Sequence, residues 1–267
     1  MLGREEEDAL DFFDSHFHLV QYMRKKGIVS LEPGSEAEPD SARKISGCTC
    51  ALDEDEFIEM EAASVSCGSI LLSFGIHPEN PDEKKLPFVE KLLARKRISA
   101  VGEIGFDFWN GREGSAAQEK IWSECLDMAL QYGVPVIIHN RKALDMMYRY
   151  ARKLSDLPSV MFHAFPFGLR EAESLLSKGI NAYFSFGKNL LKGGIRCREC
   201  VESLPLERIF LETDAPFQAS YGMPLTEVSE IEDVYRKASF LRGMDEKSFA
   251  ESIASNAQAF FPGICRS

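Results

Sequence analysis

Short apolar runs recur along the chain, and longer segments of amphipathic character separate them. A short run of apolar and β-branched residues is typical of a buried strand, whereas apolar residues three and four apart are typical of a helix. The runs predict eight strands, at Leu10–Phe13, Ile45–Ala51, Ser69–Phe74, Ile98–Gly102, Val134–Ile138, Val160–Phe162, Ala182–Phe184 and Arg208–Leu211. The other segments predict helices at Glu54–Ser66, Glu83–Arg97, Ala116–Tyr132, Leu144–Leu154, Arg170–Ser177, Ile195–Ser203, Glu230–Arg242 and Glu246–Phe260.

Strands that alternate with helices predict a parallel sheet, because each return to a parallel neighbour needs a crossover of a dozen or more residues. Eight such units in about 250 residues predict an α/β fold, a (β/α)8 barrel of the TIM type. A doubly wound open sheet is the alternative, but no long glycine-rich phosphate loop follows the first strand. No linker or internal repeat divides the chain, so we expect a single domain over residues 1–267.

The composition indicates a cytoplasmic protein. Of the 267 residues 45% are hydrophobic, yet no apolar run approaches the roughly 20 residues of a membrane span. The start, MLGREEEDAL, is acidic and lacks the features of a secretory signal. A net charge of −11 argues against long-range attraction to nucleic acid, but it is compatible with phosphate chemistry where bound metals supply positive charge. We expect Leu31–Lys44 to be an exposed acidic loop.

The seven cysteines are an odd number in a chain without signal features, which argues against a disulfide framework. The pairs Cys48/Cys50 and Cys197/Cys200 have spacings that a zinc site can use. One pair lies in a strand-like run and the other in a basic helical segment. We therefore favour reduced thiols, partly in the core, over a zinc site.

All five histidines fall at predicted carboxyl ends of strands, and two acidic residues share this placement. In a barrel this face carries the active site. Imidazole and carboxylate groups together are ligands of divalent metals, and a carboxylate bridging two ions about 3.5–4 Å apart would give a two-metal hydrolase. The residues concerned are His16, His18, His77, Glu103, His139, His163 and Asp214.

Neighbouring residues have expected roles as well. Gly102 and Gly105 flank Glu103 and allow a close approach of backbones. Asp14 or a backbone carbonyl is expected to bind the second nitrogen of a ligand histidine. Arg141 follows His139 by two and would suit a phosphate oxygen, with a structural ion pair as the alternative.

With these residues in place, the chain resembles the TatD family of metal-dependent hydrolases, within the amidohydrolase-like superfamily. The resemblance rests on motifs that follow in order through nearly the whole chain. They are DSHFHL, GIHP, VGEIGFDFW, Gln118 before a helix, PVIIHNR, FHAF, LETDAP and a closing helix that holds Asn256 and Phe260.

The resemblance implies a barrel with two divalent ions, Mg²⁺ or Mn²⁺ for activity, although Zn²⁺ or Ni²⁺ would also bind such ligands. Six residues match the metal ligands: His16, His18, Glu103, His139, His163 and Asp214. Glu103 matches the carboxylate that bridges both metals, and Asp214 matches the aspartate that takes a proton from the attacking water. These two are therefore the expected catalytic residues. His77 matches a histidine near the pocket, and with Arg141 it is the expected substrate contact.

The family implies a deoxyribonuclease that cleaves phosphodiester bonds with a metal-activated water, so DNA is the expected partner. We expect a monomer or weak oligomer. Three departures from the family pattern concern the substrate: QASYGMPL after Phe217 lacks an Arg-Asn pair, Ala164 to Phe167 replaces the usual Cys and Ser, and Glu79 follows His77-Pro78. One alternative is a metallohydrolase of the same fold acting on a small amide, lactone or phosphoester. Another is a catalytically silent binding protein, which the retained ligand set disfavours.

Overall fold

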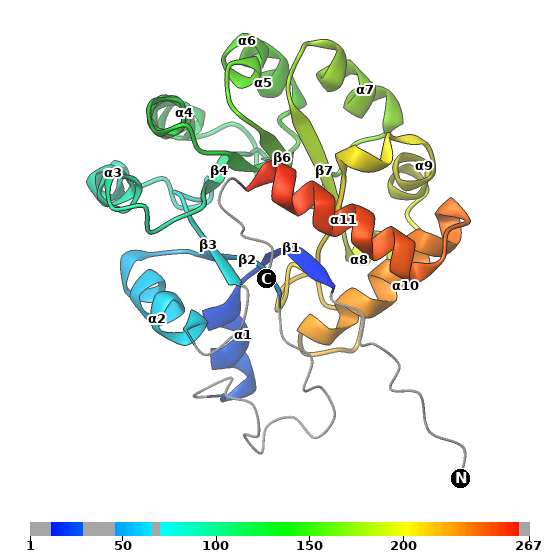
Figure 1. The fold of residues 1–267 in the computed structure, drawn as a ribbon. Helices are drawn as coiled ribbons and strands as arrows, with labels where there is room; N and C mark the ends of the chain where they lie inside the picture. The colour runs from blue at the N-terminus through cyan, green and yellow to red at the C-terminus, as the bar shows by residue number, and fades with distance from the viewer. Residues whose placement is uncertain (1–11, 29–45, 66–69, 262–267) are drawn as a thin grey trace.

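Eight parallel strands run in the order of the sequence and form a nearly closed barrel in the computed structural model of the chain (Figure 1). The structure describes residues 12–28, 46–65 and 70–261, so the predicted loop Leu31–Lys44, Cys67 and Cys265 lie outside the described residues. The strands are β1 (Phe13–Phe17), β2 (Ser46–Ala51), β3 (Ile70–Phe74), β4 (Ala100–Asp107), β5 (Val136–Arg141), β6 (Val160–Phe162), β7 (Ala182–Phe186) and β8 (Ile209–Leu211). The predicted (β/α)8 barrel is confirmed.

Helices surround the strands on the outside of the barrel (Figure 1). They are α1 (Leu19–Lys26), α2 (Glu54–Ser64), α3 (Leu86–Ala94), α4 (Ser115–Tyr132), α5 (Leu144–Arg149), α6 (Ala151–Ser155), α7 (Leu169–Ser177), α8 (Lys188–Leu191), α9 (Ile195–Ser203), α10 (Ile231–Arg242) and α11 (Glu246–Phe260). Single 3-10 turns occur at η1 (Glu83–Lys85), η2 (Leu206–Arg208) and η3 (Val228–Glu230). The short helices α1 and α8 were not predicted, and the helix predicted at Leu144–Leu154 is divided at Tyr150.

Four of the predicted strands, the first, fourth, fifth and seventh, end too early, and each omitted segment contains polar residues. The first strand is Phe13–Phe17 rather than Leu10–Phe13, so His16 lies within it and not after it. The fourth strand extends to Asp107 instead of ending at Gly102, so Glu103 lies in its middle. In the first and fourth strands, polar side chains interrupt the apolar run from which the strand is predicted. These side chains are nevertheless buried inside the barrel.

Contacts between β1 and the segment after β8 join the two edges of the sheet. The Asp214 N–H donates to His16 O at 3.0 Å, and the His18 N–H donates to Ala215 O at 2.7 Å. The buried Asp14 carboxylate accepts from the Thr213 N–H at 3.1 Å and the Thr213 hydroxyl at 2.6 Å. The same contacts that close the barrel therefore fix the backbone around three site residues.

Strand β4 lies unusually close to its neighbours, as its two glycines predict. A Cβ on Gly102 would lie 2.5 Å from Ile137 Cβ, and one on Gly105, where φ is +145°, would overlap His139 O. Since real Cβ atoms do not approach so closely, only glycine fits at either position. The close approach brings Glu103 and His139 together from adjacent strands.

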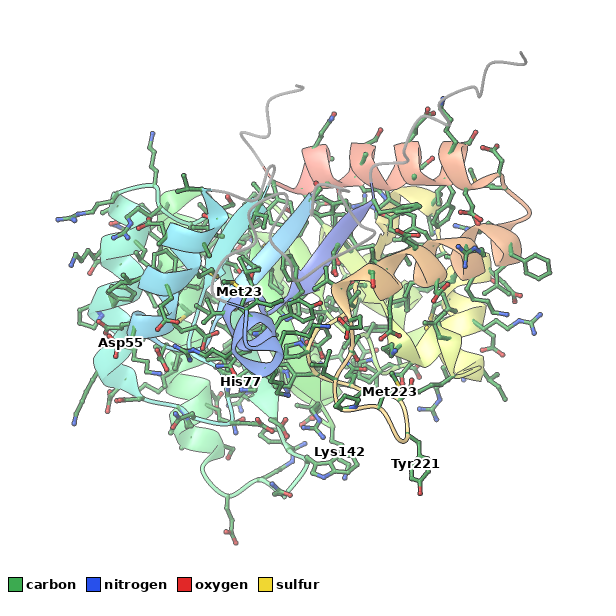
Figure 2. The ribbon with its side chains drawn as sticks, turned by 90° about the horizontal axis from the view of Figure 1, so that it is seen from below. Met23, Asp55, His77, Lys142, Tyr221 and Met223 are labelled. Atoms are coloured by element: carbon green, nitrogen blue, oxygen red, sulfur yellow. The ribbon has the colours of Figure 1, made fainter. Side chains whose placement is uncertain are left out.

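The amino-terminal end of the barrel is covered by α11, which Figure 2 shows on the opposite side of the molecule from His77. The Asn256 side-chain amide donates to Leu206 O and Ile209 O, and this holds α11 against the start of β8. Among the described residues, no helix combines the length and the apolar character needed to cross a membrane.

Candidate functional site

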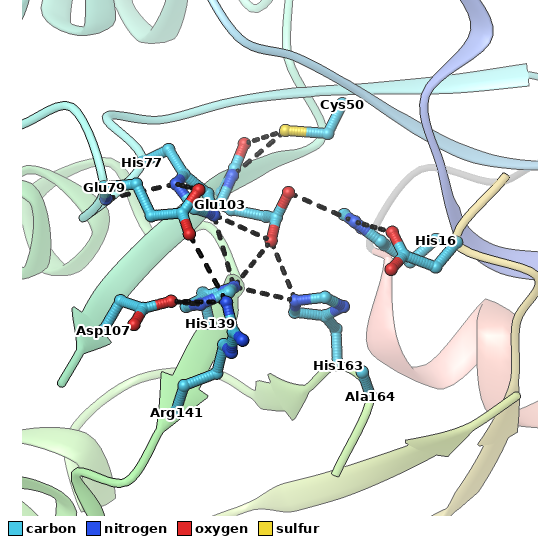
Figure 3. A network of polar contacts seen from close by, with 12 residues as sticks. His16, Cys50, His77, Glu79, Glu103, Asp107, His139, Arg141, His163 and Ala164 are labelled. Atoms are coloured by element: carbon cyan, nitrogen blue, oxygen red, sulfur yellow. Dashed lines mark hydrogen bonds and ion pairs between the residues drawn. The ribbon is translucent and has the colours of Figure 1, made fainter. Parts of the chain in front are cut away.

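Glu103 is the centre of a buried cluster at the carboxyl ends of the strands, and its two carboxylate oxygens face different histidines (Figure 3). Oε1 lies 3.3 Å from His16 Nε2 and 3.2 Å from His18 Nε2. Oε2 lies 2.8 Å from His163 Nε2 and 3.3 Å from His139 Nδ1. One carboxylate thus separates two groups of nitrogen donors, which is the arrangement of a group that bridges two cations.

Asp214 lies beside the first of these groups. Its Oδ1 is 3.5 Å from His18 Nε2 and 3.7 Å from His16 Nε2. Its other oxygen, Oδ2, accepts a hydrogen bond from the Gln218 side-chain amide at 2.7 Å. One oxygen of Asp214 is therefore held by the protein while the other faces the cluster.

A third carboxylate, Asp107, lies on the side of His139 away from Glu103. Its Oδ2 is 2.9 Å from His139 Nε2 and accepts from the Arg141 guanidinium at 3.1 Å. The Arg141 guanidinium also donates to Glu79 Oε1 at 3.4 Å. Arg141 therefore lies near the cluster, as expected, and makes a structural ion pair as well.

His77 lies at the outer edge of the cluster. Its Nε2 is 3.2 Å from His139 Nδ1 and 3.7 Å from Glu103 Oε2. Its side chain is 17% exposed, whereas that of His16 is fully buried. His77 is thus the cluster histidine that a molecule entering from solvent would meet first.

Burial and the neighbouring charges act against each other on the ionisable groups of the cluster. Burial by itself would raise the pKa of the Glu103 carboxyl, but the imidazoles of His163 and His16 outweigh it and hold that pKa well below its ordinary value. Burial likewise would lower the pKa of His18, yet Asp214 and Glu103 raise it to about 10. The carboxylates thus favour the protonated form of His18, and a bound divalent ion would displace that proton.

Two other pKa values indicate the ionisation of the outer groups. The pKa of His77 falls to about 4, chiefly because burial disfavours the imidazolium. Burial would raise the pKa of Asp107, but the hydrogen bond with His139 outweighs it and lowers the pKa to about 2. At neutral pH, His77 is therefore neutral and Asp107 is ionised.

The donor atoms fit a divalent cation. Three groups have their ligand atoms within 4.8 Å of one another: His16/His18/Glu103, His16/His163/Asp214 and His77/Glu103/His139. The Nε2 atom of His16, which faces Glu103, is buried and has no hydrogen-bond partner among the described residues. Buried nitrogen atoms of this kind normally have a partner, and imidazole nitrogen with carboxylate oxygen suits Zn²⁺, Mn²⁺ and related ions.

None of the described cysteines belongs to a group that could hold a metal. Cys48, Cys50, Cys125, Cys197 and Cys200 are free and buried, as expected for reduced thiols in the core. Cys50 nevertheless contacts the site through the backbone. Its Sγ accepts from the Glu103 N–H at 3.0 Å and donates to Gly102 O at 2.9 Å.

Strained backbone is concentrated around the cluster. Five described non-glycine residues have φ between +43° and +56°, and Asp214, Ala164, Lys142 and Gln218 are four of them. Ala164, Asp214 and Gln218 line the cavity above Glu103, and Lys142 directly follows a lining residue. Residues other than glycine adopt this conformation at a cost, and such positions are frequent at functional sites.

The cavity has a volume of about 740 Å³ and a lining that is rich in carboxylates. The carboxylates are Asp53, Glu56, Glu79, Glu103 and Asp214, and the cations are Lys85 and Arg141. An anionic substrate in this cavity would therefore depend on bound cations for much of its attraction.

The sequence prediction included the residues around Glu103 and missed several that support them. All seven predicted residues, His16, His18, His77, Glu103, His139, His163 and Asp214, lie together in the structure. Asp14 was expected to bind a ligand imidazole, but its carboxylate binds Thr213 and the His16 N–H, so that expectation is wrong. Asp107 was missed, although the sequence analysis included Gln118. The Gln118 side chain accepts from the Asp107 N–H through Oε1 and donates to Asp107 O through Nε2.

Comparisons with known proteins show the family of the chain. The sequence model of the family described as TatD related DNase matches residues 13–262. The chain is 25% identical to an uncharacterised metal-dependent hydrolase of Bacillus subtilis, YabD, over 93% of this chain and 98% of that protein. It is 33% identical to the 3'-5' ssDNA/RNA exonuclease TatD of Edwardsiella piscicida over 54% of this chain and 56% of that one. The crystal structure of YjjV, a TatD homolog from Escherichia coli, has a similar fold, with a TM-score of 0.77 at 21% identity over 94% of this chain and 98% of that one.

Proposed function

Because the chain belongs to the family of TatD related DNases and is a metal-dependent hydrolase of that family, we propose that it hydrolyses phosphodiester bonds in DNA with two divalent ions. The observation that carries the proposal is the placement of Glu103 between two groups of histidines. The name of the Edwardsiella piscicida relative, a 3'-5' ssDNA/RNA exonuclease, supports nucleic acid as the substrate.

Each ion would have its own donors and would share Glu103. His16, His18 and Asp214 Oδ1 lie near Oε1 of Glu103. His139 and His163 lie near Oε2. Divalent ions held there would polarise the phosphate. They would also lower the pKa of the attacking water, so that it loses a proton near neutral pH. Mg²⁺ or Mn²⁺ are the ions we propose for activity.

Asp214 is the proposed proton acceptor. Burial would raise the pKa of its carboxyl, but contact with His18 outweighs burial and lowers it, so the group is ionised at neutral pH. The Gln218 amide occupies Oδ2, which leaves Oδ1 directed at the cluster. Glu103, ionised for the same kind of reason, supplies the negative charge that holds the ions.

Arg141 and His77 are the proposed substrate contacts. The Arg141 guanidinium is 41% exposed and is oriented by Asp107, so it can donate to a phosphate oxygen at the cavity wall. His77 is neutral at pH 7, and its ring N–H can donate a hydrogen bond to the same phosphate.

The experiment compares wild-type protein with Asp214→Asn, each stripped of metal with EDTA and then supplied with Mg²⁺ or Mn²⁺. We expect metal-dependent release of nucleotides from DNA by the wild type and a loss of roughly 10³-fold in Asp214→Asn. Asp156→Asn, an exposed carboxylate on the outer surface, is the matched control. If no metal supports cleavage of single-stranded DNA, duplex DNA or RNA, the nuclease proposal is wrong.

A second candidate is hydrolysis of a small amide, lactone or phosphoester, which the lining of the cavity favours. Five lining carboxylates against two cations disfavour a long polyanion within the cavity itself. A volume near 740 Å³ is in the range of small-molecule sites. Turnover of a small ester with no turnover of any oligonucleotide would favour this candidate.

A further inference from the structure

One of the two tryptophans of the chain, Trp109, is 56% exposed, whereas the other, Trp122, is fully buried. Trp109 lies in the loop between β4 and α4, two residues after Asp107. An exposed indole ring can bind a ligand by stacking on another ring or by contact with a cation.

The loop holds Trp109 in a fixed position relative to the cluster. Its N–H donates to Asp107 Oδ1 at 2.9 Å, and the other oxygen of that carboxylate contacts His139. The neighbouring Phe108 N–H donates to Arg141 O at 2.9 Å. Trp109 is therefore attached to the ends of both β4 and β5, which carry Glu103 and His139.

Two cations lie against the Trp109 ring. The Arg141 guanidinium carbon is 4.8 Å from the ring centroid, and the Lys142 Nζ is 4.0 Å from it. Arg141 lines the cavity, so the three residues form a continuous strip from the cavity to the surface. Lys142 makes no ion pair with any carboxylate in the described part of the chain, and it is exposed on the same face as His77 (Figure 2).

Another part of the cavity wall repeats this combination of ring and cation. The Lys25 Nζ lies 4.9 Å from the centroid of Phe217, a lining residue. Beyond it, Tyr221 is fully exposed and Met223 is 56% exposed, and Figure 2 shows both on the face that holds His77. Aromatic and cationic side chains therefore occur together at two places on the rim.

A single-stranded nucleic acid fits this chemistry. Unpaired bases stack on aromatic side chains, and the phosphates between them bind Lys and Arg. A duplex keeps its bases stacked on one another, so it would not offer an unpaired base to Trp109. Since the net charge is −11, positive charge placed locally along the strip matters more than overall attraction.

We propose that Trp109, Arg141 and Lys142 bind the unpaired nucleotides next to the bond that is cleaved, with a base on Trp109 and phosphates on Arg141 and Lys142. These residues would hold a single strand, which is the substrate class in the name of the Edwardsiella piscicida relative. This inference rests on the proposed phosphodiesterase function. Trp109 acts in binding and takes no part in the proton transfers at Asp214.

The first test measures binding without turnover. EDTA-treated protein is titrated with oligothymidylate, and tryptophan fluorescence and the anisotropy of a labelled strand are followed. We expect quenching in the wild type and a dissociation constant roughly 5- to 100-fold higher in Trp109→Ala. Trp109→Phe should restore most of the affinity because it keeps a stacking face, and Phe240→Ala, an exposed ring on α10 outside the cavity lining, should bind like the wild type.

Lys142→Ala gives a separate signature. It should weaken binding and reduce the slope of log affinity against log salt by about 0.7, since it removes one phosphate contact. Trp109→Ala should leave that slope nearly unchanged. Equal binding of Trp109→Ala and wild type, or equal binding of duplex and single strand, overturns the proposal.

The second test separates this inference from the proposed function. With Mn²⁺ added, Trp109→Ala should raise KM for oligothymidylate and leave the hydrolysis of bis(p-nitrophenyl) phosphate unchanged. If the wild type cleaves neither substrate yet binds the single strand through Trp109, the proposed function fails and the binding strip stands. If both substrates are cleaved equally by wild type and variant, the function stands and the binding strip is rejected.

Discussion

At the amino-terminal end of β1 the Phe13 ring packs against Phe210 and Phe261, whereas at the carboxyl end of the same strand His16 and His18 face Glu103. The same contrast occurs on β8, which carries Phe210 near its start and is followed by Asp214. The same strands therefore build two regions with opposite chemistry.

The amino-terminal end is packed mainly by aromatic rings. Phe260 of α11 lies 5.3 Å from Tyr183, 5.6 Å from Phe210 and 4.6 Å from Phe261, measured between ring centroids. Such ring pairs contribute dispersion and burial energy without requiring a charge. This end is expected to supply stability and little else.

The carboxyl end has features that cost stability. It holds a buried imidazole nitrogen, Nε2 of His16, without a hydrogen-bond partner among the described residues, and Asp214 and Ala164 have strained backbone conformations. Such costs persist where they serve a ligand or a reaction. We therefore expect substitutions at the two ends to have separable effects. Those at the amino-terminal end should change stability, and those at the carboxyl end should change metal binding and activity.

The largest effect is expected at Glu103. Glu103→Gln removes the charge that two groups of donors share, so metal content should fall and activity should drop by about 10³-fold or more. Elemental analysis and steady-state kinetics measure the two quantities. Glu173→Gln, an exposed position on α7, is the control. Full metal content in Glu103→Gln would show that the ligands have been assigned wrongly.

The next effect concerns the other end of the barrel. Phe260→Ala should lower the free energy of unfolding by roughly 3–5 kcal/mol, because it opens a cavity among buried rings. Urea unfolding measures this change, and Phe240→Ala, 76% exposed, should change it by less than about 0.5 kcal/mol. Activity per folded, metal-loaded molecule should stay the same. A loss of activity comparable with that of Glu103→Gln would contradict the separation of the two ends.

A pH dependence is expected at the carboxyl end. The pKa of His18 is raised from 6.5 to about 10 in the folded protein. Its contribution to stability is therefore complete below pH 6.5 and is lost as the pH rises through 10. The unfolding free energy of EDTA-treated wild type should fall over this range more steeply than that of His18→Gln. Parallel curves for the two proteins would refute the raised pKa.

The smallest effect is expected at Cys50, which binds the Glu103 backbone from β2. Cys50→Ala leaves the Glu103 N–H without its partner and should weaken metal binding by roughly 10-fold, whereas Cys50→Ser keeps a hydrogen-bonding atom there and should restore most of the affinity. Calorimetric titration with Mn²⁺ measures the difference. Equal affinity in all three proteins would mean that Cys50 does not position Glu103.

The sequence predicts the barrel and the common location of the candidate ligands well, because both depend on local pattern. Apolar runs alternate with amphipathic segments, and each ligand directly follows or ends such a run. It does not predict the contacts that bring distant strands together. Cys50 meets Glu103 across 53 positions of sequence, and Asp107 looks like part of a turn until Gln118 and His139 are placed beside it. Helix α1 was missed because it is only eight residues long and half of its residues are polar.

We propose above all that the two oxygens of Glu103 serve two separate metal positions. The most direct test counts Mn²⁺ ions per chain by equilibrium dialysis in wild type, His16→Ala and Glu103→Gln. We predict two ions in the wild type, about one in His16→Ala and less than one in Glu103→Gln. Unchanged binding in both variants would contradict the claim.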